Sequence, residues 1–143
     1  MKTKLLILTI LLIISNLRAY SKDSDTVKIL LIGHSYLIYN NQPALLDSIC
    51  KSKGKNVFID SYLAPNTSLK NHLENEVVIS KINEQKWSFV ILYGSSLAIA
   101  YPEFFTDFSI YNVLQSFKLK IKANYSNTHI IYNMPWSLED GMS

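Results

Sequence analysis

The feature that most constrains the fold is a short apolar run, Val27–Ile32, which stops at Gly33 and is followed by Ser35. A run of branched apolar residues this short, ended by glycine, is typical of a strand buried on both faces of a parallel sheet. In such sheets, ligands and chemistry gather just beyond the carboxyl ends of the strands. The pattern therefore puts the Ser35 hydroxyl where a nucleophile would be useful. The alternative is a plain turn, in which Gly33 permits the bend and Ser35 caps the next helix.

Residues 1–19 have the three parts of a secretory signal peptide. Lys2 and Lys4 precede an apolar core at 5–14, and Ala19 offers a cleavage site. The core is about ten residues long, short of the roughly 20 that span a bilayer, which favours cleavage over an uncleaved anchor. We therefore expect a flexible lead-in at 20–26 and a domain over 27–143. The mature protein is expected to be secreted or periplasmic, without stable membrane association.

Composition argues against several other classes of protein. Cys50 is the only cysteine, so no internal disulfide can form, and we expect it to be a buried small hydrophobe. The net charge of +3 is spread along the chain, and its lysine clusters lack the aromatic interleaving of nucleic-acid binders. Gly33 is not followed by a dinucleotide-binding or Walker-type glycine pattern. The three histidines are dispersed without metal-ligand spacing, so we expect no metal and no cofactor.

Strands and helices alternate along the domain. Apolar runs predict strands at 27–33, 56–63, 88–93 and 128–134. Helical spacing predicts helices in the gaps, at 43–54, 68–73, 76–84 and 104–125. Such alternation predicts an α/β fold in three layers, with a parallel sheet between two layers of helices. The carboxyl ends of the strands then bring to one rim Ser35, Asn66, Ser95, Ser96 and Trp136.

Residues 29–46 resemble the nucleophile block of the SGNH/GDSL hydrolase superfamily, in its secreted bacterial branch. Ile-Gly-His-Ser-Tyr is followed there by Tyr-Asn-Asn-Gln-Pro-Ala-Leu-Leu. The similarity runs from about Val27 to Gly141 and includes stretches near the family's later blocks, at 67–73, 87–96 and 134–141. The resemblance implies a flavodoxin-like α/β/α fold. It also implies hydrolysis of acyl or acetyl esters, with a small-molecule or glycan ester as substrate.

The resemblance makes Ser35 the nucleophile, whose oxygen attacks an acyl carbon while a histidine takes its proton. The family's oxyanion hole uses the serine N–H, a glycine N–H and a side-chain amide. Asn66, which tolerates a positive φ, replaces the glycine, and Ser95 and Ser96 stand where the amide is expected. Loss of one such donor costs about 100- to 1,000-fold in rate. The substrate rim is expected to include His34, Tyr36 and Trp136.

The family's Asp-x-x-His pair has no counterpart in these 143 residues. His34 adjoins Ser35, but adjacent side chains in a turn diverge. His72 is expected to be a surface or helix-packing residue, and His129 starts the last strand, at the opposite rim. We therefore expect the front part of a longer hydrolase, with weak or no esterase activity and one sheet face less covered.

The alternative function is a non-catalytic secreted α/β module that binds a glycan or another small ligand. Aromatic and amide side chains at the rim would make the contacts through stacking and hydrogen bonds. The sequence carries no signal for an oligomeric state. The residues considered for this contact are Tyr36, Tyr39, Asn40, Asn41, Tyr93, Tyr101 and Trp136.

Overall fold

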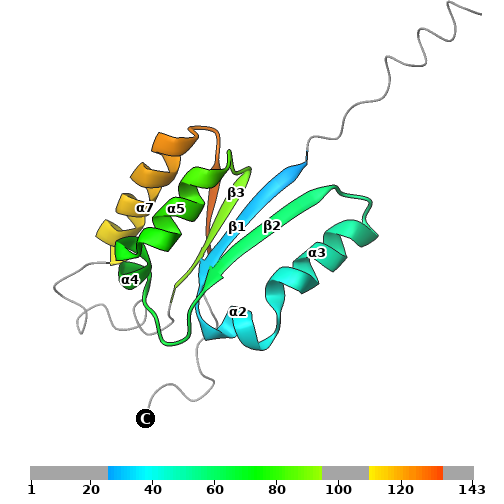
Figure 1. Cartoon of the computed structure of the whole chain (residues 1–143), viewed down its shortest axis with the longest axis horizontal. Helices are drawn as coiled ribbons and strands as arrows, with labels where there is room; N and C mark the ends of the chain where they lie inside the picture. Colours follow the sequence, from blue (N-terminus) through cyan, green and yellow to red (C-terminus); the bar gives the residue numbers. More distant parts are fainter. Residues whose placement is uncertain (1–25, 95–109, 134–143) are drawn as a thin grey trace, which may run out of the picture.

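The computed structural model describes residues 26–94 and 110–133, which form a four-stranded parallel sheet with helices on both faces (Figure 1). The strands are β1 (Val27–Gly33), β2 (Val57–Leu63), β3 (Phe89–Tyr93) and β4 (His129–Asn133). The helices are α2 (Ser35–Tyr39), α3 (Gln42–Ser52), α4 (Leu69–Glu74), α5 (Glu76–Glu84) and α7 (Ile110–Asn124). The predicted α/β alternation is confirmed, and α2 is an addition to it. The expectations for residues 1–25, 95–109 and 134–143 lie outside the described residues.

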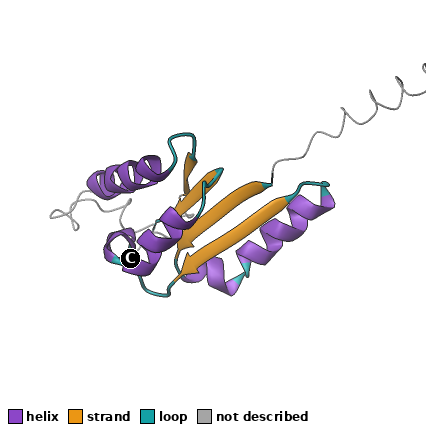
Figure 2. Cartoon of the chain, turned by 45° about the horizontal axis from the view of Figure 1, so that its top comes forward, coloured by secondary structure: helices purple, strands orange, loops and turns teal. Residues whose placement is uncertain are grey.

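The strands lie in the order β2-β1-β3-β4, so β1 is paired on both sides. Leu30 in β1 is opposite Asp60 in β2 and opposite Val90 in β3. Helices α2 and α3 cover one face of the sheet, and α4, α5 and α7 cover the other (Figures 1 and 2). A central strand between two helix layers has both faces buried, which explains the uninterrupted apolar run of β1.

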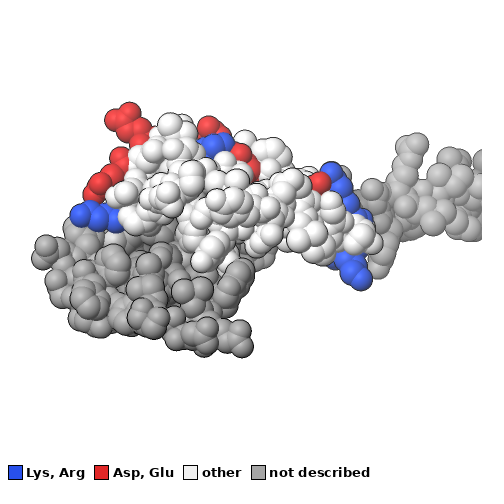
Figure 3. All heavy atoms as spheres, turned by 90° about the horizontal axis from the view of Figure 1, so that it is seen from below, with Lys and Arg blue, Asp and Glu red and all other residues white. Residues whose placement is uncertain are grey.

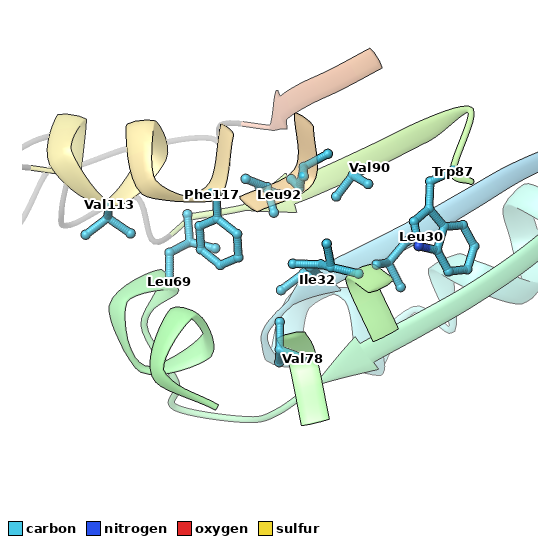
Figure 4. Packing of buried hydrophobic residues seen from close by; sticks show 11 residues of the cluster. Leu30, Ile32, Leu69, Val78, Trp87, Val90, Leu92, Val113 and Phe117 are labelled. Atoms are coloured by element: carbon cyan, nitrogen blue, oxygen red, sulfur yellow. The ribbon is translucent and has the colours of Figure 1, made fainter. Parts of the chain in front are cut away.

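The larger hydrophobic core lies between the sheet and the layer of α4, α5 and α7 (Figure 4). Phe117 of α7 is fully buried there, and the predicted apolar stripe of α7 faces this core through Ile110, Leu114, Phe117 and Ile121. Alternate residues of the central strands point into the same space because successive side chains of a strand face opposite sides. The buried members are Leu30, Ile32, Leu69, Val78, Ile82, Trp87, Val90, Leu92, Val113, Phe117 and Ile121.

The core under α2 and α3 is smaller and comprises the buried residues Ile29, Leu31, Leu37 and Tyr93. Helix α3 has no fully buried side chain because it packs mainly along the outer strand β2. Its apolar residues Leu45 and Ile49 are 55% and 50% exposed. Cys50 is half-buried rather than buried, which corrects the expectation for it.

Local capping fixes the connection between β2 and α5. Ser68 caps α4 as predicted, since its Oγ accepts the Asn71 N–H at 3.2 Å. Asn75 ends α4 and caps α5, with its Oδ1 accepting the Val77 N–H at 2.9 Å. Each cap satisfies amides that have no intrahelical partner. Among the described helices, none is long and apolar enough to cross a membrane.

Candidate active site

Ser35 lies where the direction of the strand connections reverses. The chain passes from β1 to β2 on one side, and β3 then pairs with β1 on the other side. In parallel sheets such a switch point opens a crevice beyond the carboxyl ends of the two strands. Ser35, the first residue of α2, lies two residues beyond the end of β1, and Gly94 directly follows β3. The half-buried Ser35 therefore stands at the position where this fold type usually holds its ligands.

Gly33 brings the Ser35 turn close to the sheet. A Cβ at Gly33 would lie 2.7 Å from the Leu37 Cδ1 and 2.8 Å from the Tyr93 Cβ, nearer than such atoms can approach. The only glycine with a positive φ among the described residues is Gly54, so Gly33 is not needed for an unusual backbone angle. Glycine is required at position 33 because Leu37 folds back beneath the turn.

Asn66 lies in the turn between β2 and α4, at the strand end next to β1. Its φ of 53° is in the left-handed region, which asparagine tolerates better than most residues. The Ala64 N–H donates to the Gly33 carbonyl oxygen at 3.1 Å, so this turn starts attached to the end of β1. The Thr67 hydroxyl donates to the Pro65 carbonyl at 3.1 Å and tightens the turn. Ser35 and Asn66 thus follow neighbouring strands at one edge of the sheet.

His72 of α4 is buried, with 1% of its surface exposed, which settles the choice between surface and packing in favour of packing. Its Nε2 lies 3.0 Å from the Gly33 carbonyl oxygen, so Nε2 carries the donated proton. The buried Nδ1 has no hydrogen-bond partner in the described structure, and the Tyr62 ring meets the imidazole edge-on. Burial lowers the pKa of His72, and the nearby His34 adds to this against the opposing effect of the Gly33 bond. His72 is therefore a neutral imidazole at neutral pH.

We expect the neutral His72 to make the stability of the domain depend on pH. Its pKa is lower in the folded chain than the value of about 6.5 in the unfolded chain, so the unfolded chain binds the proton more readily. The stabilisation is complete above the unfolded pKa and is lost as the pH falls below it. Urea unfolding from pH 7.5 to 5.5 should show wild type losing stability relative to His72→Gln, which cannot titrate. An equal slope for both would contradict this, and His129→Gln, at an exposed position, is the matched control.

His34 joins the ends of the two strands that flank the switch point. Its Nε2 donates to the Gly94 carbonyl oxygen at 3.3 Å, and its ring packs against Tyr36 and edge-on against Tyr93. Tyr93 is only 4% exposed, and burial, with a smaller contribution from Tyr36, raises its pKa. Tyr93 thus covers a core edge, which removes it from the rim aromatics considered for glycan contact. Tyr39, in contrast, is 82% exposed at the end of α2.

The three histidines of the chain all lie within the described residues. Their rings contact groups other than the Ser35 side chain. The bonded nitrogens of His34 and His72 go to backbone carbonyls, and the His129 ring stacks on Phe89 at the amino end of the sheet. Asp60 pairs with Lys81 at 2.5 Å and belongs to the structural contacts of β2. The part of the chain that the structure describes thus holds no histidine–serine pair.

The remaining predicted site residues, Ser95, Ser96, Tyr101 and Trp136, lie outside the described residues. Within residues 26–94 and 110–133, no group of three His, Cys, Asp or Glu residues could hold a metal ion. Figure 3 views the molecule from below, toward the end where α2 and the β2–α4 turn lie, and the charged side chains stand along the margins of the described surface.

Comparison with known proteins finds a similar fold in a solved structure. No family model matches the chain, and no curated protein matches it by sequence. Among solved structures, the chain is similar to a putative SGNH hydrolase from Slackia heliotrinireducens, with a TM-score of 0.60 and 15% sequence identity. The chain has the SGNH hydrolase fold. The match covers 80% of this chain and 59% of the Slackia protein, so the chain spans less than two thirds of the length of that SGNH hydrolase.

Proposed function

We propose that this SGNH fold carries a serine ester hydrolase, with Ser35 as nucleophile and acyl or acetyl esters, including those of carbohydrates, as substrates. The observation that carries the proposal is the position of Ser35 beyond the central strand β1, with the Asn66 turn bonded to the same strand end.

The proposed reaction is acyl transfer through a covalent intermediate. The Ser35 Oγ attacks the acyl carbon and forms a bond to it, while the Oγ proton passes to a base and then to the departing alcohol. Water next attacks the acyl-serine ester, which releases the acid and restores the Ser35 hydroxyl. Ser35 begins α2, so its own N–H lacks an intrahelical acceptor and can donate to the oxyanion. The Asn66 N–H is the proposed second donor.

The described histidines are poorly placed to act as the general base for Ser35. The Nε2 of His34 and the Nε2 of His72 are engaged with carbonyls, and the Nδ1 of His72 is buried. His129 lies at the other end of the sheet. These contacts support slow acyl transfer by the 143 residues alone. A polypeptide that extended this chain with an Asp-x-x-His pair would be expected to react far faster.

Labelling with a fluorophosphonate probe tests the proposal. We expect slow labelling of wild type over hours with excess probe, mapped to Ser35 by peptide mass spectrometry and absent in Ser35→Ala. Ser48→Ala is the matched control, since Ser48 is an exposed serine on α3 that bonds only the Ala44 carbonyl. No labelling of wild type, or unchanged labelling of Ser35→Ala, would overturn Ser35 as nucleophile. Labelling within seconds would contradict the proposal that acyl transfer is slow because Ser35 lacks a well-placed general base.

We expect Asn66→Gly to raise the labelling rate of Ser35 on the order of tenfold, a fraction of the 100- to 1,000-fold contribution of an oxyanion donor. Glycine keeps the N–H, adopts the φ of 53° without a Cβ penalty, and removes a side chain beside the acyl oxygen. Asn66→Ala is the control, because alanine also removes the carboxamide but keeps a Cβ at this φ, which costs about 1 kcal/mol, and so separates the steric effect from the backbone effect. An unchanged or lower rate in Asn66→Gly would place the second donor elsewhere.

A further inference from the structure

One backbone oxygen at the end of β1 accepts two hydrogen bonds from the connection that follows β2. The Gly33 carbonyl accepts the Ala64 N–H at 3.1 Å and the His72 Nε2–H at 3.0 Å. The segment 64–72 between these donors is thus fixed to a single atom at both of its ends. Asn66 lies inside this segment, and Ser35 lies two residues beyond the shared acceptor. The two bonds therefore set where Asn66 stands relative to Ser35.

The burial of His72 indicates that its hydrogen bond to the Gly33 carbonyl has a structural role. An apolar residue would fill the same space without leaving a buried nitrogen unpaired, and the unpaired Nδ1 is unfavourable in such surroundings. A neutral imidazole with its proton on Nε2 presents one donor, aimed at Gly33. The Tyr62 ring packs against it, and the Tyr62 hydroxyl oxygen accepts a hydrogen bond from the Asn75 Nδ2 at 3.0 Å, so the neighbouring side chain is itself held in place. Among the described residues, His34 is the other titratable group whose charge acts on His72.

The β2–α4 segment has further internal supports that make it respond as one unit. Ser68 caps α4 and the His72 N–H donates to the Ser68 carbonyl at 3.1 Å. Leu69, three residues before His72 and on the same side of α4, is buried against the end of β3 at Gly94. A displacement of the His72 ring would therefore move the start of α4 and, with it, the Asn66 turn.

We propose that His72 is a positioning residue that holds the Asn66 turn against the Ser35 turn through the Gly33 carbonyl. Its significance for acyl transfer rests on the proposed function. His72 is not a catalytic residue in this proposal, because its free nitrogen is buried and its donor faces the backbone. The role needs a neutral side chain that donates from the Nε2 position, which glutamine can supply and phenylalanine cannot.

The experiment compares wild type, His72→Gln and His72→Phe by amide hydrogen exchange and by fluorophosphonate labelling. Ile82→Val is the matched control, since Ile82 is a buried residue of α5 in the larger core and its side chain has no group that could donate a hydrogen bond to the Gly33 carbonyl. The exchange rate of the Ala64 amide is read relative to that of Phe117 in the core of α7, which corrects for global destabilisation. The labelling rate of Ser35 is measured on the same samples.

We expect His72→Phe to raise the relative exchange of Ala64 about tenfold, the equilibrium equivalent of one lost hydrogen bond, and to slow labelling by a similar factor. His72→Gln should restore both, and Ile82→Val should change neither ratio. The proposal is overturned if the relative exchange in His72→Phe equals that of wild type, or if His72→Gln behaves like His72→Phe. If wild type is not labelled at Ser35, the proposed function fails, and the exchange measurement alone decides whether His72 holds the turn.

Discussion

Replacing Phe117 with alanine is expected to lower the free energy of unfolding by about 3–5 kcal/mol. The Phe117 side chain is fully buried and lies between α7 and the sheet, beside Leu69 and Leu92 in the larger core (Figure 4). Its removal loses apolar burial and leaves a cavity that the surrounding elements would have to close. Small domains are stable by only about 5–15 kcal/mol, so the loss is a large fraction of the total.

Urea unfolding followed by circular dichroism measures this effect as a lower midpoint with an unchanged slope. Leu119→Ala is the control on the same helix, because Leu119 is 71% exposed and its replacement should change stability by about 0.5 kcal/mol or less. Equal losses in the two variants would mean that α7 does not pack on the sheet through Phe117.

The fold was predictable because each element carries its own local signal. The period of apolar residues identified the strands, and the proline and cap residues identified the helix starts. Helix α5 occupies the predicted 76–84 because Asn75 caps it, and Ser68 caps α4 as expected. Helix α2 was missed, since its five residues are too few to show a helical period.

The position of Ser35 could be predicted from one general rule, that the carboxyl ends of parallel strands share an edge. The partners of the histidines could not. The bond from His72 to Gly33 joins residues 39 apart, and the bond from His34 to Gly94 joins residues 60 apart. Both depend on the strand order, which puts β1 between β2 and β3, and alternation of strands and helices does not specify that order. The spacing of Leu69, His72 and Leu73 on one short helix was the one local signal that His72 faces the core.

The role of Gly33 also depends on a contact between distant parts of the chain, which the local sequence does not predict. The sequence assigned it to a bend, whereas the structure requires it because Leu37 and Tyr93 occupy the space of a side chain. Contacts of this kind involve a neighbouring strand and cannot be seen in the local pattern of 27–36. They also connect the packing of the smaller core directly to the turn that carries Ser35.

Gly33→Ala is therefore expected to destabilise the domain by about 1–3 kcal/mol, as overpacking of a close-packed site does, and to displace the Ser35 turn. The new methyl group cannot be accommodated unless Leu37 or the backbone of β3 moves, since it would lie 2.7 Å from Leu37 and 2.8 Å from Tyr93. The Ser35 N–H and the Gly33 carbonyl would move with the turn. Fluorophosphonate labelling of Ser35 should then fall by more than about tenfold even where the variant remains folded, because acyl transfer is sensitive to displacements of about 1 Å.

Gly54→Ala separates this effect from a simple loss of stability. Gly54 has a φ of 65°, and the space that an alanine methyl group would take there is open to a distance of 4 Å. Alanine at this position therefore costs about 1–2 kcal/mol through the backbone alone. Gly54 lies in the α3–β2 loop, at the amino end of the sheet, away from Ser35. Urea unfolding should give comparable losses for the two variants, while only Gly33→Ala slows labelling. Equal labelling rates would mean that the close approach at Gly33 supports the smaller core without setting the geometry of the Ser35 turn.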